Sequence, residues 1–187
     1  MPRPVRLLVT LALTTVVLLA PAGAASAATT APAKGTVLSF ALLTPNTATA
    51  PNAGTMAAPG DSITVTGAGV FVPSAGTVHA GGTFVHRGAD GTLRCRGTWK
   101  ATALTGWTDF AATRGGAHSG VISLLVTHSC TTTGMVHTDI PMTVTSTRNT
   151  PPGSHLVQGV TVGDFTVPTR GAVAIRGGRH AEPPVMV

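Results

Sequence analysis

The stretch GGTFVHRGADGTLRCRGTW, residues 81–99, carries the pattern that decides the fold. Two runs of alternating apolar and polar residues flank the dipeptide Asp90-Gly91. Alternation with a period of two places successive side chains on opposite faces of a strand, and Asp-Gly between two such runs is typical of a β-hairpin. The stretch therefore predicts a hairpin whose second strand carries Cys95 and Trp99 on its inner face.

The same alternation recurs along the chain, separated by turns rich in glycine and proline. Charged residues make up only 10% of the sequence, and threonine and valine, which favour strands, are frequent. Glycines on the inner faces mark sharp bends or close backbone approaches, which favours a barrel. We therefore predict an all-β fold, a single antiparallel β-barrel of seven to eight strands, with a two-sheet β-sandwich as the alternative. The predicted strands are 36–43, 61–72, 77–86, 93–104, 119–130, 135–146, 155–167 and 171–176.

The N-terminus has the features of a secretory signal peptide. Arg3 and Arg6 precede an apolar run over 7–20, and the small residues 25–27 form a cleavage signature. The run is shorter than the roughly 20 residues that a membrane anchor needs, so we prefer the signal peptide to the anchor. We predict a signal peptide over 1–27 and a secreted chain that is not associated with the membrane after cleavage.

The remaining chain is long enough for one domain with its own core. We predict a flexible N-terminus over 28–34, a barrel domain over 35–176 and a frayed tail over 177–187. Residues 44–60 are rich in Ala, Pro, Thr and Asn and show no apolar periodicity. We interpret this segment as a mobile surface loop, with a linker as the alternative. Residues 107–116 are predicted to be a further loop.

Residues 66–84, TGAGVFVPSAGTVHAGGTF, together with 97–102, GTWKAT, carry a family resemblance. They resemble a pattern in secreted actinobacterial proteins of unassigned function, in which a G-x-G-x-F strand precedes G-G-T-F-x-H and G-T-W-x-A-T strands. The glycine pattern over 67–76 is also similar to that of the allene oxide cyclase and dirigent barrels. This second resemblance implies an eight-stranded barrel and carries no catalytic residue across.

Charge and motifs exclude several classes of partner. Without Arg3 and Arg6 the chain has 10 basic and 6 acidic residues, and the basic ones are scattered. A nucleic-acid-binding protein has a denser basic stripe, so we expect no nucleic-acid partner. The sequence contains no phosphate-binding loop and no dinucleotide fingerprint, and we expect no cofactor.

Two cysteines in an exported chain favour a disulfide. Cys95 and Cys130 both fall on the inner faces of their predicted strands, as a bridge across the barrel requires. We predict that they are bonded to each other, and a pair of buried free thiols is the alternative.

Inward-facing histidines are the candidate polar groups of a ligand site. His86 and His128 share faces with core residues, and His86 ends its strand beside the turn. No H-x-H or H-E-x-x-H motif is present, so we predict no metal site. The ligand-binding hypothesis places His86, His128, Trp99 and Phe84 at one mouth of the barrel. The alternative is that both histidines are hydrogen-bonded structural residues.

The strand predicted over 135–146 has two faces and one irregularity. Alternation places Val136 and Ile140 inward and His137 and Asp139 outward. Pro141 cannot donate to a neighbouring strand, which indicates an edge or a bulge nearby.

Carboxylates in a catalytic arrangement are not evident. We expect Asp61 and Asp164, at strand ends, to bond to their own backbone, and nothing in the sequence pairs Asp109 with another acid. The segment 116–121, GAHSGV, does not match the nucleophile motif G-x-S-x-G. We therefore assign no catalytic residue.

These observations favour a secreted, non-enzymatic β-barrel. The expected partner is a small apolar molecule or an extracellular component such as the cell surface. The alternative is a barrel enzyme of isomerase or cyclase type that works through inward histidines such as His86 and His128. An interior filled by side chains favours a structural role, whereas an apolar cavity lined by histidine favours binding or catalysis.

Overall fold

The computed structural model describes residues 35–112, 115–147 and 154–177. The predicted signal peptide, the segment 28–34 and residues 178–187 of the tail lie outside these ranges. The described chain has ten antiparallel strands and no α-helix, which confirms the all-β prediction. No described helix is long and apolar enough to cross a membrane. The elements are β1 (Leu38–Leu42), β2 (Asn46–Thr49), β3 (Ser62–Val72), the 3₁₀ turn η1 (Pro73–Ala75), β4 (Thr77–Arg87), β5 (Leu93–Ala112), β6 (Ala117–Cys130), β7 (Val136–Ser146), β8 (Gly159–Val162), β9 (Val167–Arg170) and β10 (Val173–Gly177).

The strands curl into an uneven ring. Hydrogen-bonded pairing runs from β1 through β10, β6, β5, β4 and β3 and returns to β1. Beyond this closed part, β2 pairs with β3 and β9, while β7 pairs with β6 and β8. The strand β8 lies against β2 and β9 and completes the wall on that side.

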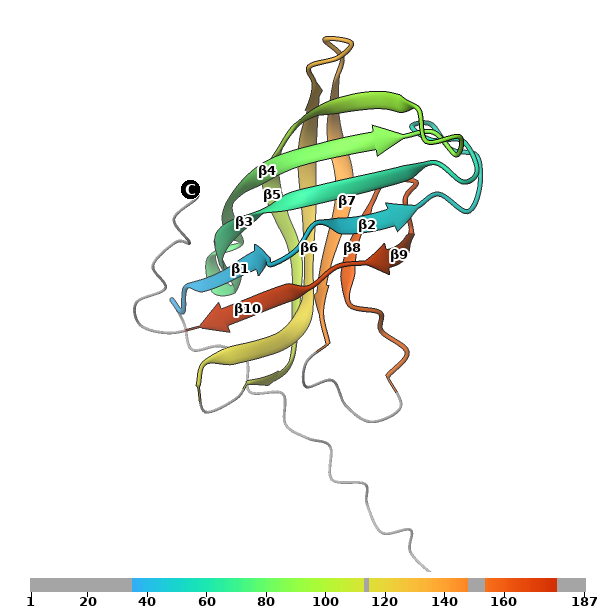
Figure 1. The fold of residues 1–187 in the computed structure, drawn as a ribbon. Coiled ribbons are helices and arrows are strands. Elements are labelled where there is room, and N and C mark those ends of the chain that lie inside the picture. Colours follow the sequence, from blue (N-terminus) through green and yellow to red (C-terminus); the bar gives the residue numbers. More distant parts are fainter. Residues whose placement is uncertain (1–34, 113–114, 148–153, 178–187) are drawn as a thin grey trace, which may run out of the picture.

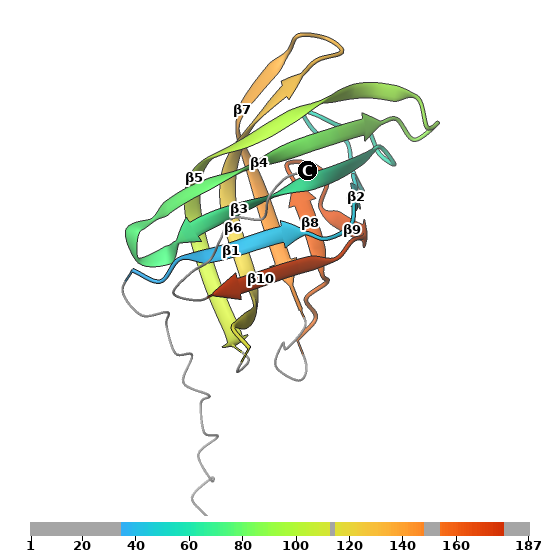
Figure 2. The same ribbon diagram turned by 60° about the vertical axis from the view of Figure 1, so that its left-hand side comes forward.

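Two pairs of short strands lie end to end. Figures 1 and 2 show β1 in line with β2 and β9 in line with β10. Taking each pair as one interrupted strand leaves eight, the upper end of the predicted number. In Figure 1 the strands β1 to β4, β9 and β10 cross the steeper β6, β7 and β8, so the ring has two faces that pack at a large angle.

The strand β5 is longer than the sequence predicts. It continues from Leu93 to Ala112, so most of the predicted loop over 107–116 is strand. Its register against β6 shifts three times, each shift marking a bulge or irregularity. Bulges bend a strand and interrupt its alternation, which explains why the pattern is lost after Leu104.

Two other segments also differ from their predictions. The segment 44–60, predicted as a loop, contains β2, which pairs with β3 and β9 and buries Ala48. Asparagine and alanine are depleted in strands, and the sequence NTAT of β2 has no large apolar residue to mark its inner face, so the sequence shows no apolar periodicity there. Within the strand predicted over 155–167, only Gly159–Val162 forms β8. The chain then turns, and Val167 begins β9.

The interior is filled by apolar side chains from all around the ring. Trp99 is 2% exposed, and its Nε1 donates a hydrogen bond of 2.8 Å to the carbonyl oxygen of Thr66. The indole lies against Gly67 and Gly82, where an added Cβ would meet the ring. These inner-face glycines therefore provide the space that Trp99 occupies, in agreement with the predicted close approach. The largest fully buried apolar side chains besides Trp99 are Phe40, Phe71, Phe165, Leu38, Ile63, Ile122, Leu124, Met142, Ile175 and Val65.

Candidate functional site

A pocket of about 240 Å³ remains at one end of the ring despite this filled interior. It lies where β4 and β6 end and where β5 and β7 begin, and we call it the mouth pocket. It brings together Phe84, His86 and His128 of the predicted ligand site. The full lining is Thr55, Met56, Ile63, Phe84, His86, Arg94, Cys95, His128, Cys130, Thr133, Met135, His137 and Phe165.

Trp99 is not part of this lining, although the sequence analysis placed it in the ligand site. It is the cross-strand partner of His128 in the β5–β6 ladder. Its indole is directed over the glycines of β3 and β4 instead, where its only ring donor is already bonded to Thr66. Trp99 is therefore a core residue of the barrel wall.

His86 is held by a buried carboxylate. Its Nε2 lies 3.1 Å from Oδ2 of Asp61, which is 5% exposed. Asp61 also accepts hydrogen bonds from the backbone N–H groups of Ala58 and Ala89. Burial alone would raise the pKa of Asp61, but the hydrogen bonds from Ala58, His86 and Ala89 together lower it. The carboxylate is thus ionised at neutral pH.

An ionised carboxylate only accepts hydrogen bonds, so the proton between the two side chains belongs to Nε2 of His86. In the neutral imidazole this leaves Nδ1 as the ring atom with a lone pair. The ring also packs edge-on against Phe165, with centroids 5.0 Å apart. Asp61 was expected to bond to its own backbone, but two of its three contacts join it to a distant part of the chain.

His128 is the most unusual residue of the pocket. It is 2% exposed and stacks on Phe84 with ring centroids 4.5 Å apart. Neither of its ring nitrogens has a hydrogen-bond partner within the described residues. Burial, with a smaller contribution from the nearby His137, lowers its pKa from 6.5 to about 4. His128 is therefore neutral at pH 7, with one donor and one acceptor that the surrounding described side chains do not satisfy.

His137 joins the pocket because β7 carries a bulge. His128 pairs with His137, whereas Val126 pairs with Ile140, so β7 has one more residue than β6 between these pairs. Asp139 lies in this segment with a φ of 57°, a left-handed conformation that aspartate tolerates. The extra residue reverses the faces, so His137 lines the pocket and Val136 is 59% exposed. The predicted orientations of these two residues were wrong.

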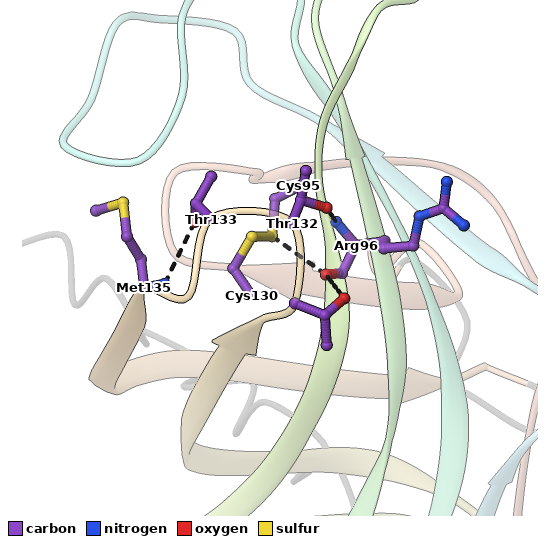
Figure 3. Close-up of a disulfide and its surroundings, with 7 residues drawn as sticks. Cys95, Arg96, Cys130, Thr132, Thr133 and Met135 are labelled. Carbon is purple, nitrogen blue, oxygen red and sulfur yellow. Dashed lines mark hydrogen bonds between the residues drawn. A yellow bond between two sulfur atoms is a disulfide. The ribbon is translucent and has the colours of Figure 1, made fainter.

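The disulfide forms part of the pocket wall. Cys95 and Cys130 are bonded, with their Cα atoms 5.8 Å apart, as the sequence predicts. Figure 3 shows the bridge beside the β6–β7 turn. That turn is also tied to β5, because Thr131 donates to the carbonyl oxygen of Arg96 and Thr132 accepts from the N–H of Arg96. The bridge and these bonds hold the β5 and β6 sides of the pocket together.

The segment 50–60 contributes Thr55 and Met56 to the pocket wall. Asp164, in the β8–β9 turn, accepts a hydrogen bond of 2.6 Å from the N–H of Met56. Asp164 was expected to bond to its own backbone, and this contact instead joins it to a segment more than a hundred residues away. The bond positions Met56 beside Phe165 and next to the mouth.

A second aspartate–histidine pair lies elsewhere in the ring. His118 Nδ1 is 2.9 Å from Oδ2 of Asp109, and both side chains are largely buried. The sequence analysis left Asp109 without a pairing, because the register shifts in β5 conceal its position opposite the start of β6. Neither residue lines the mouth pocket. Over the described ranges, no three His, Cys, Asp or Glu side chains are grouped so as to hold a metal ion.

We expect His128 to make the stability of the fold dependent on pH. Its folded pKa of about 4 lies below its unfolded value of 6.5, so the unfolded chain binds more protons between these values. Stability is therefore lost as the pH falls from 6.5 to about 4, by roughly 3 kcal/mol in total. Denaturant unfolding of wild-type protein across this range measures the loss.

The variant His128→Phe has no titrating group at this site and should lose this part of the pH dependence. His79→Phe, on the exposed side of β4, is the matched control and should retain it. An unchanged slope in His128→Phe would show that another group is responsible.

Comparisons with protein-family models, with curated proteins and with solved structures returned no match.

Proposed function

We propose that this chain is an exported β-barrel protein that binds a small, mainly apolar molecule in the mouth pocket. The observation that carries the proposal is His128, which is buried in the wall of the pocket while both of its ring nitrogens lack a hydrogen-bond partner among the described residues. A buried polar group without a hydrogen bond costs about 1 to 3 kcal/mol. A ligand that supplies the hydrogen bond would recover this energy.

The size and lining of the pocket support a ligand built around one ring. A dry protein cavity of about 150 Å³ is large enough to bind benzene, and the mouth pocket measures about 240 Å³. Met56, Met135 and Cys95 are lining residues that keep exposed apolar surface, whereas Phe84, Phe165 and Ile63 are almost fully buried. His128 provides one polar position. This combination, a mainly apolar cavity with few polar groups, is typical of small-molecule sites.

Export is supported by two features. The N-terminal sequence has the pattern of a signal peptide, and the described chain contains a disulfide. Disulfides persist in oxidising environments outside the cytosol. The bridge lies in the pocket wall, so the proposed ligand site would form in its bonded state in that compartment.

Nuclear magnetic resonance of the histidine ring protons tests the binding proposal. Benzyl alcohol, titrated to millimolar concentration, should shift the ring signals of His86 and His128. His155, which is exposed and does not line the mouth pocket, is the internal control and should not respond. Unchanged His86 and His128 signals would contradict the proposal and would favour a role in which the outer surface contacts an extracellular partner.

A further inference from the structure

The mouth pocket combines two histidines whose surroundings give them different chemical roles. His86 bonds to the ionised Asp61 through Nε2, and the neutral form of its imidazole then carries its lone pair on Nδ1. His128 is kept neutral by burial, and its ring N–H is not used by any described residue. Neighbouring histidines held in different environments, one bonded to a carboxylate and one buried, can act as the base and the hydrogen-bond donor of an acid–base site.

The neighbouring charges are compatible with this division of roles. Arg94 from β5 and His137 from β7 also line the pocket, and Asp61 lies behind His86. No aspartate or glutamate is among the described lining residues. A negative charge that develops on a ligand oxygen would therefore meet donors and a cation in the wall, with no carboxylate to repel it.

From this arrangement we propose that the mouth pocket catalyses the enolisation of small, mainly apolar ketones or aldehydes, with His86 as the base and His128 as the hydrogen-bond donor to the carbonyl oxygen. Asp61 acts as a positioning residue, because it holds His86 in one tautomer and does not line the pocket. The inference rests on the proposed binding function and adds a reaction to it.

The step balances without an oxidant or a cofactor. Nδ1 of His86 takes a proton from the carbon next to the carbonyl group, and the electron pair of the broken C–H bond moves to the oxygen to form an enolate. The ring N–H of His128 stabilises that oxygen by hydrogen bonding. Protonation of the enolate by the imidazolium of His86 restores the carbonyl compound and the neutral base. In D₂O the proton on Nδ1 exchanges with the solvent before it is returned, so the carbon receives a deuteron.

Deuterium exchange into phenylacetone, followed by proton NMR in D₂O, tests the reaction. General acid–base catalysis contributes about 100-fold or more, so we expect exchange at least about 100-fold faster with bound protein than in buffer. His86→Gln can retain a hydrogen bond to Asp61 but lacks a basic nitrogen, so exchange should fall to the buffer rate while phenylacetone still binds. His79→Gln, on the same strand outside the pocket, is the matched control and should exchange at the wild-type rate.

The outcomes separate the two proposals. Phenylacetone that binds to wild-type protein but exchanges at the buffer rate would overturn the catalytic inference and leave the binding function intact. Exchange that persists in His86→Gln would also overturn it, because the base would then be another group. An absence of both binding and exchange would overturn both proposals. Circular dichroism and retained binding of phenylacetone by His86→Gln establish that the variant is folded.

Discussion

Replacing Trp99 with alanine is expected to lower the free energy of unfolding by about 3 to 5 kcal/mol, the range for removing a large buried aromatic side chain. Trp99 is 2% exposed and fills the space above Gly67 and Gly82. Its removal would leave a cavity whose glycine walls have no side chain to fill it. It would also remove the hydrogen bond to the carbonyl oxygen of Thr66. Chemical denaturation monitored by far-ultraviolet circular dichroism measures the change.

Trp99→Phe separates the two contributions. Phenylalanine keeps most of the apolar volume but cannot donate to Thr66, so the loss should be smaller than for alanine. Because Trp99 does not line the mouth pocket, Trp99→Phe should also bind benzyl alcohol as the wild type does. A loss below about 1 kcal/mol for Trp99→Ala would contradict the account of the core.

Removing the disulfide with the double variant Cys95→Ala, Cys130→Ala is expected to cost roughly 3 to 4 kcal/mol. The bridge closes a segment with a sequence separation of 35 residues, and the cost follows from the larger conformational freedom of the unfolded chain without it. We also expect weaker ligand binding, because the bridge is itself part of the pocket wall. Unfolding in urea and the benzyl alcohol titration measure these two effects.

Reduction of the wild-type protein provides the control for this variant. Under reducing conditions the wild type should approach the stability of the double variant, while the double variant should not respond to the reductant. Equal stability of the oxidised wild type and the double variant would contradict the prediction.

The sequence predicts those features of this fold that depend on regular alternation. The β4–β5 hairpin and the inward direction of Cys95 and Cys130 follow from a period of two, and the structure confirms them. The same regularity places His86 and His128 on inner faces, and both line the mouth pocket.

Interruptions of that period explain what could not be predicted. The bulge before Ile140 turns His137 into the pocket and Val136 out to solvent. A single extra residue in a strand does not alter the amino-acid composition around it, so the sequence does not reveal the bulge. The only sequence signal nearby is Pro141, which indicates an irregularity but not its position. The register shifts in β5 likewise leave no sequence signal, so the position of Asp109 opposite the start of β6 could not be predicted.

Contacts between distant segments account for the remaining differences. Asp61 and Asp164 have the sequence context of turn residues, and their bonds to His86 and Met56 depend on how the ring closes. The pocket wall formed by 50–60 depends on the same closure. A single sequence contains no direct record of such pairings, so the aspartate–histidine arrangement became visible only in the folded chain.

The proposed binding function requires that His128 is kept without a hydrogen-bond partner in the pocket wall at a cost in stability. The most direct test is the free energy of unfolding of His128→Phe at neutral pH, measured with and without benzyl alcohol. We expect His128→Phe to be more stable than the wild type without ligand, by about 1 to 3 kcal/mol, and benzyl alcohol to stabilise the wild type much more than the variant. A variant that is less stable than the wild type, and that is stabilised by benzyl alcohol to the same extent, would contradict the claim.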